Sequence, residues 1–125
     1  MLPTDKIIAT FEKMYPGKHI VKNSEKKPTE ILCEVEPVTS HSQYSVAIAV
    51  INKSTPHSHN ISSETYTVIR GTLKLHANDE VIELKRDQSH TIEPGVIHWA
   101  EGDETWVECL SRPGWTKEDH ILKSE

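Results

Sequence analysis

The chain has 125 residues, the size of one ordinary domain. It carries 19 acidic and 14 basic residues and a net charge of −5, and no basic cluster is larger than a pair such as Lys26 and Lys27, which disfavours a nucleic-acid partner. The longest apolar run, residues 46–51, is too short to span a membrane, and the N-terminus lacks the layout of a signal peptide. We therefore expect a cytoplasmic protein without nucleic-acid or membrane partners.

The N-terminal part is predicted to form one helix followed by a loop. Over residues 4–16, apolar residues such as Ile7 and Phe11 recur at a spacing of three and four, the pattern of one helix face, and Pro16 and Gly17 end it. Residues 22–29 are polar and contain a proline, which indicates a solvated loop.

From residue 30 onward the apolar period falls to two, which is typical of β-strands. Residues 43–51 are β-branched and apolar enough for a strand that is buried on both faces. Eight short strands without intervening helices predict an all-β sandwich, jelly roll or barrel. The expected strands are 30–36, 43–51, 64–70, 72–77, 80–86, 89–93, 96–101 and 105–111, with a turn at Gly102 and Asp103 between the last two.

The predicted helix, loop and strands divide the chain into three segments. Residues 1–29 form the N-terminal helix and polar loop, residues 30–112 the barrel, and residues 113–125 a tail that begins with a turn. The sequence indicates no function for the tail.

Three histidines and a glutamate form the main candidate site. His57 and His59 are one residue apart, so in an extended segment both imidazoles point to the same side. Glu64 can reach the same point from the next strand, and His98 can add a third imidazole from a later one. Three nitrogens and one carboxylate oxygen suit a divalent transition metal (Zn, Fe, Mn, Ni or Cu) and do not choose among them.

This spacing resembles the two motifs of the cupin superfamily. The positions that match are His57, His59, Glu64 and Gly71 in the first motif, and Gly95 and His98 in the second. The positions that depart are Ile51, Asp87, Glu93 and Gly102, none of which is a ligand position. The resemblance implies a single-domain cupin jelly-roll barrel with one metal ion inside, commonly as a homodimer.

Strand alternation extends the site beyond the ligands. The face that carries Glu64 also carries Tyr66 and Arg70, so Tyr66 is a candidate catalytic residue and Arg70 a candidate for substrate binding. Over residues 105–111 two sets compete for the interior. If Trp106, Glu108 and Leu110 face inward, Trp106 offers a stacking platform for substrate and Glu108 a second acid or base; otherwise Val107, Cys109 and Ser111 line the pocket.

The remaining histidines and the two cysteines are predicted to be structural. The cysteines, Cys33 and Cys109, lack a paired spacing and are expected in the core. The histidines expected at the surface or in packing are His19, His41, His76, His90 and His120.

Three functions remain open for a small-molecule site of this kind. The first is a metal-dependent isomerase or epimerase of a small polar, carbohydrate-like substrate, and the second is an Fe(II)-dependent dioxygenase. The third is a module that binds a sugar without chemistry. An intact ligand set favours an enzyme, and polar, acidic candidates such as Tyr66 and Glu108 favour a polyol substrate over an aromatic one.

Overall fold

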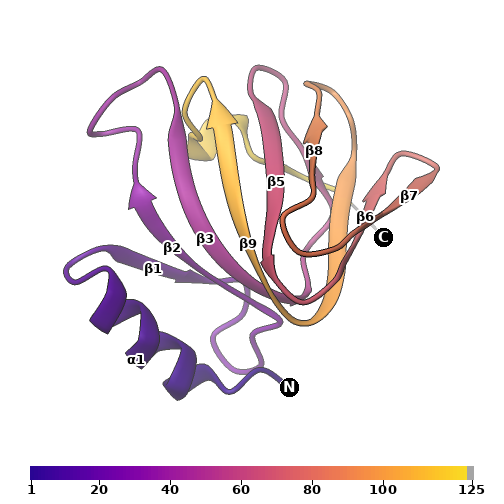
Figure 1. Cartoon of the computed structure of the whole chain (residues 1–125). Helices are drawn as coiled ribbons and strands as arrows, with labels where there is room; N and C mark the ends of the chain where they lie inside the picture. The colour runs from indigo at the N-terminus through magenta and orange to yellow at the C-terminus, as the bar shows by residue number, and fades with distance from the viewer. Residues whose placement is uncertain (124–125) are drawn as a thin grey trace.

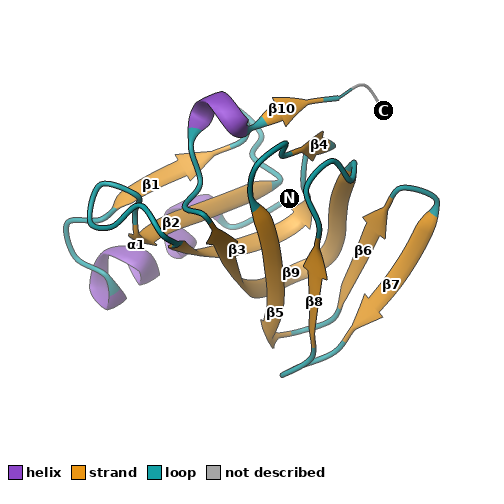
Figure 2. Ribbon diagram, turned by 90° about the horizontal axis from the view of Figure 1, so that it is seen from above, coloured by secondary structure: helices purple, strands orange, loops and turns teal. Residues whose placement is uncertain are grey.

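The computed structural model describes residues 1–123 and shows one strongly curled β-sheet with a helix on its outer side (Figure 1). The sheet curls into an all-β jelly-roll half-barrel, and its curvature is clearest from above (Figure 2). The first elements are α1 (Thr4–Met14), β1 (His19–Lys22), β2 (Glu30–Glu36), β3 (Ser45–Lys53), β4 (His57–Ser58) and β5 (Ser63–Arg70). They are followed by β6 (Leu73–Ala77), β7 (Glu80–Leu84), β8 (Ser89–Ile92), β9 (His98–Arg112), a 3-10 turn η1 (Lys117–Asp119) and β10 (Ile121–Leu122).

Strand β3 separates two hydrophobic clusters, as its apolar sequence predicts. Ala49 and Ile51 point into the barrel, where they pack with residues of β5, β6 and β9. Ile48 and Val50 point outward, beneath α1, whose Phe11 is fully buried. Since both faces of β3 exclude water, an uninterrupted apolar run is stable there.

Strand β9 is one continuous strand of 15 residues, where two strands separated by a turn were expected. Its first part pairs with β6, and its second part pairs with β3 on one side and β5 on the other. The chain bends at residues 102–105 without turning back: Glu104 adopts a φ of 51°, and its backbone N–H donates to Asn52 Oδ1 at 2.7 Å. The predicted turn at Gly102 is therefore wrong.

Three short strands that the sequence did not indicate, β1, β4 and β10, complete the sheet. Strand β1 pairs with β2, so residues 30–36 do not form a sheet edge. Strand β10 pairs with β4, which brings the C-terminal tail beside His57.

No helix within residues 1–123 is long and apolar enough to cross a membrane. Cys33 is buried under α1 and Cys109 packs against the barrel core, and neither forms a disulfide.

The bend in β9 generates a prediction about Gly102. A Cβ at this position would collide with the Thr105 side chain, 2.8 Å from its Cβ, and would lie 3.1 Å from the Ile51 carbonyl oxygen. Gly102→Ala should therefore destabilise the fold by about 1–3 kcal/mol, measured by chemical denaturation. Asp103→Ala, at an exposed neighbour, is the control. Equal stability of the two variants would contradict the close packing at the bend.

Candidate metal centre

Four buried side chains from three parts of the sheet meet inside the barrel. His57 begins β4, His59 follows it, Glu64 lies on β5, and His98 begins β9. His57 and His98 are direct cross-strand partners. The four residues each offer one ligand atom, and these atoms lie within 4.8 Å of one another. The structure thus brings together all four residues that the spacing predicted.

The carboxylate is at the centre of this cluster. Glu64 Oε1 lies 3.0 Å from His98 Nε2, 3.7 Å from His59 Nε2 and 3.8 Å from His57 Nε2. Burial alone would raise the pKa of Glu64, but the three imidazoles outweigh it and hold the pKa well below its usual value. The carboxylate is therefore ionised at neutral pH.

The three imidazoles share one hydrogen-bonding arrangement. Each uses its Nδ1–H to donate to a backbone carbonyl oxygen, which leaves the Nε2 lone pair free to face the cluster. The acceptors are Thr55 O for His57 at 2.8 Å, Asp119 O for His59 at 3.0 Å, and Val96 O for His98 at 3.0 Å.

This arrangement fits a bound metal ion and is electrostatically unfavourable without a cation. Three Nε2 lone pairs and a carboxylate face one another, and they repel unless a cation lies between them. His59 Nε2 is buried and has no hydrogen-bond partner in the described chain. Burial acts to lower the pKa of His59, but the Glu64 carboxylate, whose Oε1 lies 3.7 Å from His59 Nε2, outweighs it and raises the pKa. Without a metal ion, a proton takes the cation's place.

The C-terminal tail holds the loop between His59 and Glu64. Asp119 of η1 accepts hydrogen bonds from the backbone N–H groups of residues 60–62, at 2.8 to 3.2 Å. Burial opposes ionisation of Asp119, but these N–H groups dominate and lower its pKa. Its carboxylate and its carbonyl oxygen thus fix both the ligand loop and the ring of His59.

His120, expected at the surface or in packing, lies against the cluster. Its ring stacks on His57 with centroids 4.4 Å apart, and it lies 5.5 Å from the ring of His59. Trp115 Nε1–H donates to His120 Nδ1 at 3.1 Å. Burial, together with the charges of His57 and His59, lowers the pKa of His120 to about 4, so its ring is neutral at pH 7.

Two further titratable groups face the interior. Tyr66 is buried, with its ring 6.0 Å from that of His98. Burial and the charge of Glu64 raise the pKa of Tyr66 well above its usual value. Glu30, which the sequence analysis did not select, pairs with Ile51 of the barrel core. Burial raises the pKa of Glu30 to about 7. The charge of His57 acts to lower this pKa, and the charge of Glu64 acts to raise it.

The other expected pocket residues lie away from the cluster. Trp106 packs on Phe11 of α1, with ring centroids 5.4 Å apart, because α1 covers the outer face of β9. Glu108 is on that same face, opposite Ile48. Arg70 follows a register shift in β5 and stacks over Trp106 at 5.2 Å. The interior face of this strand therefore carries the other set, Val107, Cys109 and Ser111.

The remaining histidines match their structural interpretation. His76 stacks on Trp99 and its Nε2 lies 2.9 Å from Glu101 Oε1. His19 and His41 lie beside Glu34 and Glu36 respectively. His90 is paired within β8 opposite Tyr66.

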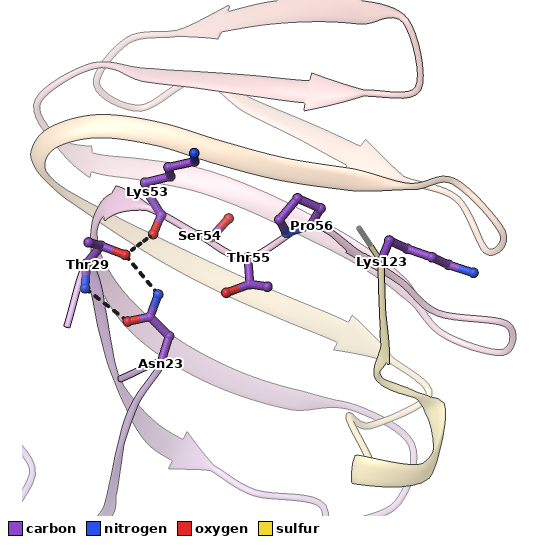
Figure 3. Close-up of a pocket in the computed structure, with 7 residues that line it drawn as sticks. All are labelled: Asn23, Thr29, Lys53, Ser54, Thr55, Pro56 and Lys123. Carbon is purple, nitrogen blue, oxygen red and sulfur yellow. Dashed lines mark hydrogen bonds between the residues drawn. The ribbon is translucent and has the colours of Figure 1, made fainter. Parts of the chain in front are cut away.

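A polar pocket of about 170 Å³ adjoins the segment that leads into β4 (Figure 3). Residues that line the pocket form hydrogen bonds with one another. The side chain of Asn23 donates to Thr29 Oγ1 and accepts from the Thr29 backbone N–H, and the Thr29 hydroxyl donates to Lys53 O. The side chains of Lys53 and Lys123 extend away from these groups in Figure 3. None of the four clustered ligands lines this pocket.

Comparison with known proteins agrees with the fold and the ligand spacing. The family model of the cupin domain matches residues 46–111, just over half of the chain, so the protein belongs to the cupin family. No match was found among curated proteins.

Solved cupin-fold structures superpose on most of the chain at low sequence identity. PAC13, a nucleoside dehydratase from Streptomyces, has a TM-score of 0.74 and 16% identity, and the match covers 89% of this chain and 90% of that one. KdgF from Halomonas has a TM-score of 0.64 and 16% identity, with 77% and 89% covered. Oxalate decarboxylase from Bacillus subtilis has a TM-score of 0.70 and 13% identity, with 86% and 31% covered.

The contacts of Asp119 predict that the tail controls metal affinity. Asp119→Ala removes the acceptor of three backbone N–H groups between two ligands, so the loop should lose its fixed geometry. We expect metal affinity to fall by roughly 10- to 100-fold, measured by competition with a chelator. Glu118→Ala, at an exposed position of the same turn, should leave affinity unchanged. A matching loss in both variants would contradict the specific role of Asp119.

Proposed function

We propose that this cupin is a metal-dependent enzyme that moves a proton on a small, polar, carbohydrate-like substrate, as an isomerase or epimerase does. The observation that supports this most directly is the presence of proton-transfer groups beside the four ligands His57, His59, Glu64 and His98. When bound, a divalent cation supplies Lewis acidity, which polarises a substrate carbonyl or hydroxyl oxygen.

Glu30 and Tyr66 differ in the protonation states that they favour. Because the pKa of Glu30 is raised to about 7, its carboxyl group can both accept and donate a proton near neutral pH. Tyr66 keeps its proton because its pKa is raised well above the usual value, so it serves as a hydrogen-bond or proton donor. We assign Glu30 the role of base and Tyr66 that of donor, in place of the predicted role of Glu108.

The structural neighbours are compatible with a polar, oxygen-rich ligand. One of the PAC13 structures is described with uridine, a molecule that carries a sugar. These neighbours are 13 to 16% identical to this chain, so they support the fold and leave the substrate to experiment.

Proton abstraction predicts isotope exchange. Protein loaded separately with Mn, Zn, Ni, Cu and Fe(II) should exchange a carbon-bound hydrogen of an aldose or ketose for deuterium in D₂O, detected by mass spectrometry. His59→Ala, which removes a ligand, is the control and should abolish exchange. Oxygen uptake triggered by substrate with Fe(II) would instead favour the dioxygenase. Sugar binding by calorimetry without any turnover would favour the binding module.

The role of Glu30 predicts a pH dependence. The base must be ionised, so the rate should rise with pH through the pKa of Glu30, at or somewhat below 7 because a bound cation favours the carboxylate. Glu30→Gln should lower the rate by roughly 100-fold or more and remove this limb of the profile. Glu34→Gln, on the same strand, is the control. A profile with an unchanged limb in Glu30→Gln would assign the base to another group.

We also propose a cytoplasmic homodimer. Cys33 and Cys109 are both unpaired, which suits a reducing compartment, and dimers are common among cupins. Light scattering at micromolar concentration should give about twice the monomer mass of 14.2 kDa. A mass near that of one chain would contradict the dimer.

A further inference from the structure

His120 is held beside the metal centre by contacts on two sides. Strand β10 begins at the next residue and pairs with β4, so the backbone after His120 runs along the strand that carries His57. On the other side, Asp119 is tied to the ligand loop by its carboxylate. The imidazole is thereby placed over the ring of His57, half-buried.

The hydrogen bond from Trp115 determines which nitrogen of His120 carries the proton. Trp115 Nε1–H is only a donor, so His120 Nδ1 must accept and cannot carry a hydrogen. In the neutral ring the proton therefore sits on Nε2. This tautomer is the opposite of the one in His57, His59 and His98, whose Nδ1 atoms donate.

This tautomer separates His120 from the metal ligands. Its Nε2 offers a hydrogen instead of a lone pair, and His120 lies outside the group of four residues whose ligand atoms converge. Within residues 1–123, His120 Nε2–H has no hydrogen-bond acceptor, and it is not among the fully buried polar atoms. A donor beside the metal centre can therefore serve a bound ligand.

We propose that His120 donates a hydrogen bond from Nε2 to an oxygen atom of the small molecule held at the metal centre, which makes the C-terminal tail part of the substrate site. The proposal rests on the proposed function, because it requires a metal-held ligand. It favours ligands that present an acceptor oxygen next to the coordinating one, such as a 2-hydroxy acid or a hydroxycarbonyl compound.

The full chain loaded with Co(II) allows a direct test, because the visible spectrum of Co(II) reports metal and ligand binding without turnover. Glycolate, a minimal 2-hydroxy acid, is the probe. Its affinity should fall roughly tenfold in His120→Phe, the size of one hydrogen bond, while Co(II) affinity stays unchanged. His120→Gln keeps an N–H donor and should retain part of the affinity. His76→Phe, a stacked histidine on the outer face, is the matched control.

Each outcome decides between alternatives. Equal glycolate affinity in wild type and His120→Phe, or a wild-type spectrum that glycolate leaves unchanged, would contradict the proposal while the metal centre stands. Loss of Co(II) binding in both His120→Phe and His120→Gln would identify His120 as a ligand and overturn its role as donor. Failure of the wild-type protein to bind Co(II), Zn or Mn would instead overturn the proposed function itself.

Discussion

The orientation of three imidazole rings is the constraint on which the rest of the site depends. Each ring donates its Nδ1–H to a backbone carbonyl oxygen, so its Nε2 lone pair is directed at Glu64. For His57 and His98 the acceptor is two residues earlier in the chain, so local backbone geometry is sufficient. For His59 the acceptor is Asp119, 60 residues away, so this ligand requires the complete fold.

The C-terminal tail is consequently part of the metal centre. Asp119 holds the loop of residues 60–62 through its carboxylate and the ring of His59 through its carbonyl oxygen. Strand β10 adds a short pairing with β4. Because the tail and the ligands hold each other, metal binding should stabilise the docked tail, and a docked tail should favour metal binding.

The sequence was sufficient for most strands and for the shared face of His57 and His59, because these follow from local periodicity, and the resemblance to the cupin motifs added Glu64 and His98. Two histidines at a spacing of two share a face in any extended segment. Alternation could not decide the face of β9, since both sets of residues contain apolar and polar members. The decision comes from Phe11, which packs on Trp106 and turns that set outward. Contrary to the prediction from alternation, Arg70 does not face the interior, because β5 shifts register after Val68.

Other parts of the site depend on contacts distant in sequence, which no local pattern reveals. His120 reaches His57 only because β10 returns along β4. Glu30 has the same alternation as Glu34, and burial at its end of β2 is the main cause of its raised pKa. Together with Tyr66, these two residues distinguish this site from a bare set of metal ligands.

X-ray absorption spectroscopy of the metal-loaded protein tests the central claim most directly. With Zn or Mn, the account predicts one ion per chain, with three imidazole nitrogens and one carboxylate oxygen in its coordination shell, and one imidazole fewer in His59→Ala. Binding of well below half an equivalent, or a shell without imidazole, would contradict the account.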